Sequence, residues 1–487
     1  ASLSGPRVER AAAPADLASL ELPPERMRAL GEQVLARVVA HLASLERQPA
    51  CGDVAAQDLC RSLRAGPPEH GTELEALLTP LFEQWVGRSF NTAGPGYLAF
   101  IPGGGLYASA LADFIADATN RYTGVWQAAP ALVQLEANVL DWLREWMGFP
   151  PGTRGLLTTG GSMANFAAVV TAREARLGER LREGVLYAST QSHLCISKAA
   201  KLAGILPDRV RRVPVDGAFR MRVDALRDAI AADRAAGLRP FLVVSTAGTT
   251  NTGAVDPLDA IAELCAEQGL WHHCDGAYGA FFHMVPELRP LLAGLSRADS
   301  LALDPHKGLF LPYGTGAVLV RDGAALRAAH AGTAEYLPPP ADEEFYDPAQ
   351  YGPELSRDFR GLRVWLPLQL HGTAAFRAAI AEKRQLAVEA AATLAQRPGL
   401  VLLAPPQLSL FAFHLHRPGA DLERDNADTR RLLAAVNARQ RVMITGCTVD
   451  GRFLARVCVL SFRTRRERID LAVRDISEEA ASILGSV

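Results

Sequence analysis

The sequence predicts an α/β fold with a mostly parallel, doubly wound sheet. Between Gly155 and Arg321, short apolar runs recur, and the first several are separated by segments with the apolar spacing of helices. Such alternation is typical of βαβ units, in which a helix connects two parallel strands. A hydrophobic content of 49% and a charged content of 21% fit a globular protein with a large core. The seven runs are GLLTT, GVLYAS, VRRVPV, FLVVSTAG, LWHHCD, SLALDP and GAVLVRD.

Two further parts are expected on either side of this sheet. At a typical length of roughly 150 residues per domain, the 487 residues correspond to about three units. Residues 1–105 are expected to contain a helical segment followed by a Gly/Pro-rich loop. The first helix of this segment, MRALGEQVLARVVAHL, follows a Pro-Pro pair. Residues 106–372 contain a long amphipathic helix and the sheet. Residues 373–487 alternate strands and helices as a small α+β domain.

Composition excludes several classes of protein. Lys plus Arg is 51 and Asp plus Glu is 53, and the net charge of −2 argues against a strongly basic nucleic-acid-binding protein. No apolar run reaches the roughly 18 residues of a membrane-spanning helix, so no membrane partner is expected. The seven cysteines are odd in number and include no C-x-x-C pair, which favours reduced thiols and a cytoplasmic location without a metal site.

Lys307 is the first candidate for chemistry. It lies in SLALDPHKGLFLP, directly after a predicted strand and among apolar neighbours. A lone lysine is usually a solvated surface residue. Burial would instead lower its pKa and make the amine a nucleophile suited to Schiff-base formation. His306 beside it is either a proton donor or an ordinary loop residue.

Asp275 is the second candidate, at the end of the run LWHHCD. A carboxylate at the tip of a buried strand needs a partner, because burying an unpaired charge is costly. It is either a turn former before Gly276 or a counter-ion for a cationic ligand atom. Ala277 and Gly279 are small and leave room for a flat group.

Three more features follow predicted strand ends. TTGGSMAN places a glycine turn and Ser162 at a helix start, where N–H groups bind phosphate, although such turns are often only tight connections. His193 precedes another helix, where a histidine more often packs or caps, and STAGTTNTG supplies hydroxyls at Thr249 and Thr250. Ligands of α/β sheets bind at this edge. An amine, a carboxylate, a phosphate site, an imidazole and hydroxyls together are the groups that hold pyridoxal phosphate.

On these motifs, and on YLAFIPGGG, HCDGAYGAFF, SRDFRGLRVWLPLQLHG and FLARVCVLSFRT, the sequence resembles the pyridoxal-phosphate-dependent group II amino-acid decarboxylases. The similarity runs from about Leu22 to the C-terminus. It implies a fold-type I PLP-dependent transferase-like architecture and an obligate homodimer with shared active sites.

The resemblance also assigns cofactor contacts. Lys307 corresponds to the Schiff-base lysine and Asp275 to the partner of the pyridine nitrogen, while His193 and Ala277 lie on opposite faces of the ring. Asp304 occupies a position where relatives often have Asn. The cofactor residues implied are Gly161, Ser162, His193, Thr250, Asp275, Ala277, Asp304, His306 and Lys307.

For the substrate, the resemblance implies that Phe100, Ile101, Pro102 and Gly103 line the pocket of the partner subunit. Gly103 stands where aromatic decarboxylases carry Thr, which leaves the substrate open. Ser356 occurs where plant enzymes tend to have Ser for phenolic and Gly for indolic substrates, which favours a phenolic amino acid.

The segment 333–353 resembles a catalytic loop whose tyrosine protonates Cα after carbon dioxide leaves. Tyr346 is the nearest candidate for this catalytic tyrosine, Tyr336 and Tyr351 compete with it, and a tyrosine that only packs the loop is the alternative. In plant relatives, Phe at this position accompanies oxidative deamination to an aldehyde.

The sequence therefore predicts PLP-dependent decarboxylation of an L-amino acid to the amine and carbon dioxide. An aromatic amino acid is favoured, and a phenolic one among these. The same cofactor would also serve an aldehyde synthase, an aminotransferase or a carbon–carbon lyase. A PLP-binding scaffold protein is the alternative outside enzymes.

Overall fold

The computed structural model describes residues 20–53, 55–339 and 344–485. They fall into two compact units, one from the described residues of 1–48 and 52–89, the other from those of 49–51 and 90–487. The first unit contains helices α1 (Pro24–Ser44), α2 (Gln57–Ser62) and α3 (Leu74–Pro80). Helix α1 begins with Pro24 at its first position, as predicted, because proline lacks only an N–H that would have no partner there.

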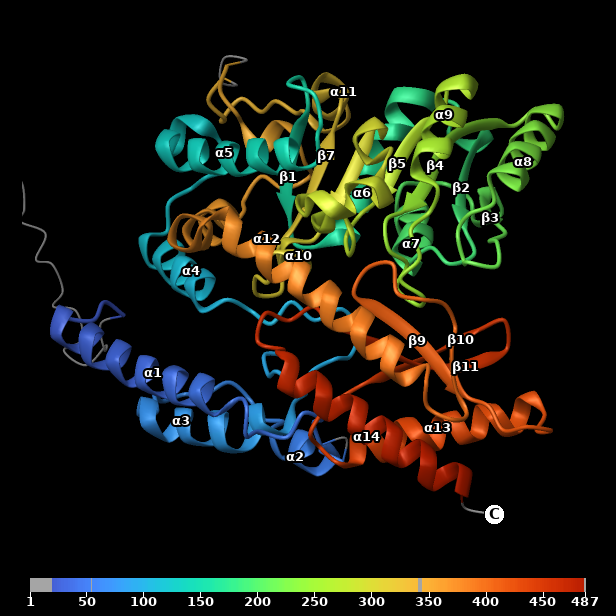
Figure 1. Ribbon diagram of the computed structural model, residues 1–487. Helices are drawn as coiled ribbons and strands as arrows, with labels where there is room; N and C mark the ends of the chain where they lie inside the picture. Colours follow the sequence, from blue (N-terminus) through green and yellow to red (C-terminus); the bar gives the residue numbers. More distant parts are fainter. Residues whose placement is uncertain (1–19, 54, 340–343, 486–487) are drawn as a thin grey trace, which may run out of the picture. The chain divides into compact units, whose positions relative to one another are not determined.

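A seven-stranded sheet forms the centre of the second unit, in the order β1-β7-β6-β5-β4-β2-β3 (Figure 1). Each of the seven predicted apolar runs overlaps one of its strands. Four strands are buried along their whole length, which explains why their sequences show no polar alternation. The strands are β1 (Arg154–Thr158), β2 (Gly184–Ser189), β3 (Val210–Val213), β4 (Arg239–Thr246), β5 (Trp271–Asp275), β6 (Ser300–Leu303) and β7 (Gly316–Val320).

The sheet is parallel except at β7, which runs antiparallel to both β6 and β1. The connection between β6 and β7 spans only residues 304–315 and contains the one-turn helix α10 (Pro305–Gly308). A connection without a crossover helix returns the chain in the opposite direction. It also places Lys307 immediately beyond the carboxyl end of β6.

Helices cover both faces of this sheet (Figure 1). Successive strand residues point to opposite faces, so Leu156 packs with α6 while Leu157 packs with α5. On one side lie α6 (Gly161–Leu177), α7 (Leu194–Leu202) and α11 (Gly323–His330). On the other lie α5 (Pro130–Trp146), α8 (Val223–Ala235) and α9 (Leu258–Gln268), with α4 (Tyr107–Thr119) packed on α12 (Arg360–Leu394).

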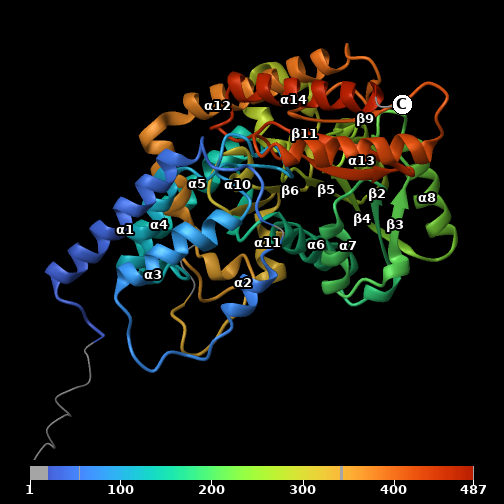
Figure 2. The same cartoon turned by 90° about the horizontal axis from the view of Figure 1, so that it is seen from below.

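A second, antiparallel sheet of four strands follows in the order β10-β11-β9-β8. Figure 2 shows its strands β9 and β11 beside α13. Its strands are β8 (Leu400–Leu402), β9 (Leu410–Leu415), β10 (Thr445–Val449) and β11 (Arg452–Cys458). Helices α13 (Leu422–Ala438), α14 (Arg466–Gly485) and the second half of α12 supply its core. Helix α12 is interrupted at Gly372, whose φ of 74° suits glycine. The predicted domain boundaries 1–105, 106–372 and 373–487 stay predictions.

Candidate active site

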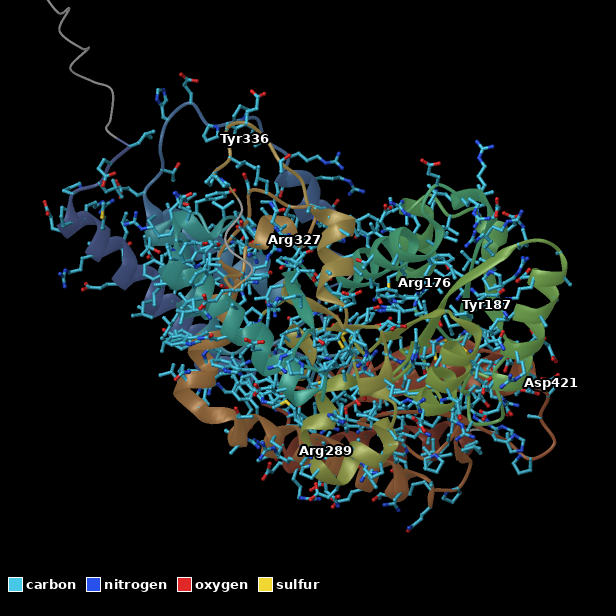
Figure 3. All side chains as sticks on the ribbon, turned by 90° about the horizontal axis from the view of Figure 1, so that it is seen from above. Arg176, Tyr187, Arg289, Arg327, Tyr336 and Asp421 are labelled. Carbon is cyan, nitrogen blue, oxygen red and sulfur yellow. The ribbon has the colours of Figure 1, made fainter. Side chains whose placement is uncertain are left out.

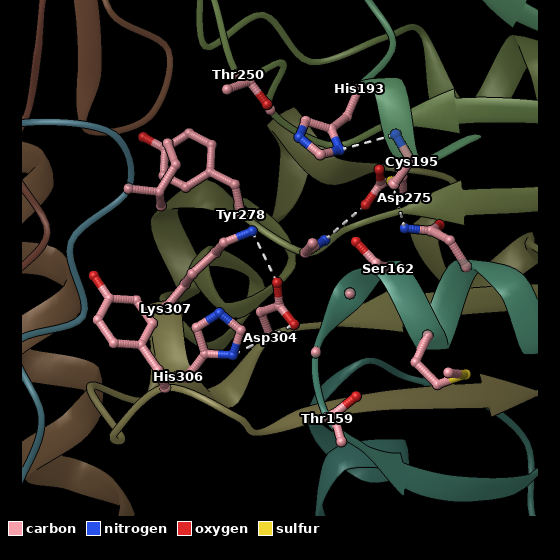
Figure 4. Close-up of a pocket in the computed structure, with 18 of the residues that line it drawn as sticks. Thr159, Ser162, His193, Cys195, Thr250, Asp275, Tyr278, Asp304, His306 and Lys307 are labelled. Carbon is pink, nitrogen blue, oxygen red and sulfur yellow. Dashed lines mark hydrogen bonds and ion pairs between the residues drawn. The ribbon is translucent and has the colours of Figure 1, made fainter. Parts of the chain in front are cut away.

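A cavity of about 340 Å³ lies where β4, β5 and β6 end and α6 and α7 begin (Figure 4). This is the edge at which doubly wound sheets bind ligands. Ten of the predicted site residues line it, although they come from six separate segments of the chain. They are Ile101, Gly161, Ser162, His193, Thr250, Asp275, Ala277, Asp304, His306 and Lys307.

Lys307 projects into the cavity from α10, and its side chain is 24% exposed there. Its Nζ lies 2.8 Å from Asp304 Oδ2. Burial favours the neutral amine, but the Asp304 and Asp275 carboxylates outweigh it and raise the pKa of Lys307 above its ordinary value. Beside these carboxylates the lysine is therefore an ammonium ion, and it becomes a nucleophile only after losing a proton.

Asp275 ends β5 and is 5% exposed. One of its oxygens accepts a hydrogen bond from the Ala277 N–H at 3.2 Å. Burial raises the pKa of the Asp275 carboxyl, and the charge of Lys307 opposes this rise. A cationic ring nitrogen in the cavity would supply the counter-ion that this buried carboxylate needs.

The start of α6 forms a cradle for an anion. Gly160 is its N-cap, and no side chain in the described part of the chain caps it. A Cβ at Gly161 would lie 2.9 Å from Asp304 Oδ2 and 3.0 Å from Ala277 Cβ, so a larger residue would fill the cradle. Ser162 follows, and it is exposed to the cavity. Uncapped N–H groups and a hydroxyl at a helix N-terminus fit a phosphate group.

Two imidazoles face the same space. His193 caps α7, and its Nδ1 accepts the Cys195 N–H at 3.2 Å, so the neutral ring carries its proton on Nε2. Burial lowers the pKa of His193 and of His306, so both are neutral at pH 7. His306 Nδ1 lies 2.7 Å from the Thr315 carbonyl oxygen and donates to it.

Two buried polar atoms at the cavity have no hydrogen-bond partner among the described residues, namely Thr246 Oγ1 and Asp304 Oδ1. Such atoms are costly unless a ligand or water satisfies them. The residues present therefore fit a phosphate-bearing, cationic heteroaromatic group. Sequence reasoning did not single out Thr246, although it ends the run FLVVST at the same sheet edge. It also missed Asn165 and Tyr313 in the cavity wall.

Tyr346 does not line this cavity, and its assignment as the catalytic tyrosine stays a prediction. It lines a separate pocket of about 170 Å³ beside Gly155. Its hydroxyl donates to the Gly155 carbonyl at 3.1 Å, and its ring stacks on Tyr351. Tyr336, by contrast, is 78% exposed on the preceding segment (Figure 3). Residues 340–343 of the predicted catalytic loop lie outside the described residues.

Four predicted substrate residues also lie outside the cavity, with Pro102 among them. Phe100 is 52% exposed, with a φ of 51°. Gly103 backs onto the chain beside Lys307, because a Cβ there would approach the His306 carbonyl oxygen to 1.9 Å. Ser356 lines an open pocket of about 490 Å³ with Tyr122 and Tyr336. Their assignment to the substrate stays a prediction.

Arg456 of β11 holds two loops of the site together. Its side chain donates to the Phe100 carbonyl at 3.2 Å, the Thr250 carbonyl at 2.6 Å and Thr445 Oγ1 at 2.8 Å. Arg463 likewise donates to the carbonyls of Ala93, Gly104 and Gly105. From the sequence alone, no role was expected for the residues of the motif FLARVCVLSFRT. Its two arginines position the segments on either side of Ile101.

Comparison with known proteins bears on this site. A family model described as the pyridoxal-dependent decarboxylase conserved domain matches residues 62–416. The chain belongs to this family. An aromatic-L-amino-acid decarboxylase from Bacillus atrophaeus is 34% identical, over 95% of this chain and 98% of that protein.

Solved structures agree. The crystal structure of Oryza sativa TDC with PLP and tryptamine superposes with a TM-score of 0.92 at 27% identity, covering 96% of this chain and 100% of that one. The structure of Rhodiola rosea 4-hydroxyphenylacetaldehyde synthase gives 0.89 at 27% identity, covering 95% and 100%. The predicted fold-type I architecture, family and pyridoxal phosphate cofactor are confirmed, and the protein is a PLP-dependent amino-acid decarboxylase of this family. No described helix is long and apolar enough to cross a membrane.

Proposed function

We propose that the protein converts an aromatic L-amino acid to its amine and carbon dioxide. The observation that carries this proposal is the placement of the Lys307 amine and the Asp275 carboxylate in one cavity with the uncapped α6 N-terminus. Pyridoxal phosphate, when bound, supplies an aldehyde for amine exchange and a ring that withdraws electrons from substrate Cα. The aromatic substrate follows from the relatives, of which a bacterial one is named for that activity.

The residues of this chain divide the work of binding and proton transfer. Gly161 and Ser162 bind the phosphate. Asp275 Oδ holds a proton on the ring nitrogen, and buried surroundings strengthen this interaction. Lys307 Nζ, which lies 2.8 Å from Asp304 Oδ2, must give up its proton before it reacts.

The remaining cavity residues orient the ligands. His193 presents Nε2–H, which is suited to a substrate carboxylate or to returning a proton, and Ala277 packs against the opposite ring face. The Thr250 hydroxyl adds a hydrogen bond near the ring or the carboxylate. His306, whose Nδ1 is engaged by the Thr315 carbonyl, keeps Nε2 for the phosphate side or the proton steps.

The proposal includes a homodimer with shared sites. Phe100 is half exposed and lies outside the cavity of its own chain, which is expected if it lines the partner's substrate pocket together with Pro102 and Gly103. Ser356 favours a phenolic substrate. The seven cysteines are free thiols, which supports a cytoplasmic location.

Two measurements test the function. Carbon dioxide release should occur with one or more aromatic amino acids, and activity on none of them would refute the proposal. The visible absorbance of the cofactor bound to lysine should disappear on borohydride reduction and be absent from Lys307→Ala. A Lys307→Ala protein that kept this absorbance would remove Lys307 from its assigned role.

An aldehyde synthase is the second candidate, because one solved relative has that name. Release of ammonia and peroxide instead of amine would identify it. Tyr336→Phe, Tyr346→Phe and Tyr351→Phe separate the three tyrosine candidates within the same assay. The tyrosine that returns the proton should shift product from amine to aldehyde when changed to Phe, whereas a tyrosine that only packs should leave the product ratio unchanged.

A further inference from the structure

Asp304 is a buried carboxylate with one paired and one unpaired oxygen. It precedes α10 and is 2% exposed. Oδ2 lies 2.8 Å from Lys307 Nζ, whereas Oδ1 lies 3.7 Å from His306 Nδ1 and has no hydrogen-bond partner in the described part of the chain. A buried charge of this kind is retained only with a partner, and Lys307 is that partner in the ligand-free site.

The same carboxylate adjoins the α6 N-terminus. Oδ2 would lie 2.9 Å from a Cβ at Gly161, and Oδ1 would lie 4.0 Å from one at Gly160. A phosphate seated on this cradle therefore places its oxygens against those of Asp304. A phosphate and a carboxylate that adjoin in a buried site repel each other strongly, and one of them is expected to hold a proton.

The other charged groups around Asp304 do not offset this repulsion. Among the residues lining the cavity, Lys307 is the cation, and it faces two carboxylates, Asp304 and Asp275. Arg363 of α12 approaches from behind Thr315, but Asp113 pairs with it at 2.6 Å.

The histidines, Cys195, Tyr313 and Lys307 around the cavity keep their ionisation states near pH 7.5. Burial lowers the pKa of His193 and His306 and raises the pKa of Cys195 and Tyr313, and the pKa of Lys307 is raised. None of these groups therefore changes charge between about pH 7 and 8.5, given their ordinary values.

We propose that Asp304 couples cofactor binding to proton uptake, so that its carboxylate leaves Lys307 and shares one proton, drawn from solvent, with the incoming phosphate. The proton lies between an Asp304 oxygen and a phosphate oxygen as a short O–H···O⁻ hydrogen bond. Lys307 is thereby released from its ion pair as the phosphate binds. This inference rests on the proposed function only for the identity of the cofactor.

The proposal predicts that affinity for a phosphorylated ligand falls as pH rises. One proton taken up per phosphate bound corresponds to as much as a tenfold weaker affinity per pH unit. The Asn side chain of Asp304→Asn carries no charge and donates to the phosphate directly, so its binding is tighter at pH 8 and lacks this proton.

The test uses cofactor-free full-length protein with pyridoxine 5′-phosphate, which has no aldehyde and cannot bond to Lys307. Titration calorimetry at pH 8 in two buffers of different ionisation enthalpy counts the protons. Wild type should take up about one more proton than Asp304→Asn. The ratio of the wild-type to the variant Kd should rise from pH 7 to 8.5, and the probe's own ionisation cancels in that ratio.

Unphosphorylated pyridoxine should give a ratio that does not depend on pH. Asp224→Asn changes net charge equally at an exposed site and should match wild type. Asp304→Ser, a second neutral variant, replaces Asp304→Asn if the latter does not fold by circular dichroism.

Equal proton uptake in wild type and variant, a ratio independent of pH, or weaker binding by both neutral variants would overturn the proposal. Binding of the probe to none of the proteins would overturn the cofactor site as well. Normal proton coupling without carbon dioxide release would leave the inference standing and refute only the proposed reaction.

Discussion

The buried ion pair between Glu136 of α5 and Arg357 anchors the chain before α12, and breaking it should be strongly destabilising. The two charged groups are 2.6 Å apart, and each side chain is 1% exposed. Glu136 Oε2 also accepts the Gly361 N–H at 3.2 Å. We consider Glu136→Gln, Arg357→Met and the double variant.

The magnitude follows from this burial. At an effective dielectric constant of about 20, two unit charges at 2.6 Å attract by about 6 kcal/mol. Desolvation of both ions cancels most of that gain, so the intact pair contributes little net stability. Removing one partner leaves the other buried and unpaired, at a cost of about 3–5 kcal/mol. The double variant removes both charges and should recover most of the loss.

Urea unfolding of the cofactor-free protein, followed by circular dichroism, measures these differences. Each single variant should unfold at a clearly lower urea concentration, and the double variant should lie closer to wild type than either. Single variants within about 1 kcal/mol of wild type would refute the reasoning. So would a double variant whose loss equals the sum of the two single losses, because the charges would then act independently.

Two further predictions concern packing and pH. Gly103→Ala would bring its Cβ to 1.9 Å from the His306 carbonyl oxygen. At an overpacking cost of about 1–3 kcal/mol, this variant should weaken cofactor binding about tenfold or more. Gly152→Ala, which has open space around its Cβ, should bind the cofactor normally in the same titration. Burial lowers the pKa of His272 and His273 to about 3. The unfolded chain therefore binds up to two more protons at these histidines as the pH falls below 6.5, and together they should lower stability by about 3 kcal/mol between pH 6.5 and 5. His273→Gln should halve this loss in urea unfolding at the two pH values, and an unchanged loss would contradict the pKa assignment.

The sequence was sufficient for the strands and for most of the cavity, for one physical reason. A strand buried on both faces is a continuous apolar run, and residues directly after such runs meet at one sheet edge. Asp275 and Lys307 could be predicted in this way because each lies at or just after the end of a buried strand.

Residues whose positions depend on contacts with parts of the chain distant in sequence could not be predicted in this way. The position of Tyr346 depends on a hydrogen bond to Gly155, which is 191 residues away, and no local pattern reports it. Thr246 was hidden for a different reason, since a threonine inside an apolar run looks like ordinary strand composition. The role of Arg456 rests on backbone carbonyls, which every residue possesses and which leave no mark on the sequence.

The hydrogen bonds of Arg456 have a consequence for how the enzyme matures. They join residues separated by 356 and 206 positions, so the wall that carries Phe100 and Thr250 lacks these hydrogen bonds until β11 has been synthesised. Domains fold progressively during synthesis, and the C-terminal segments emerge last. The cofactor half of the pocket can then assemble before the half that surrounds Ile101, and a nascent chain completes its active centre only after β11 has emerged.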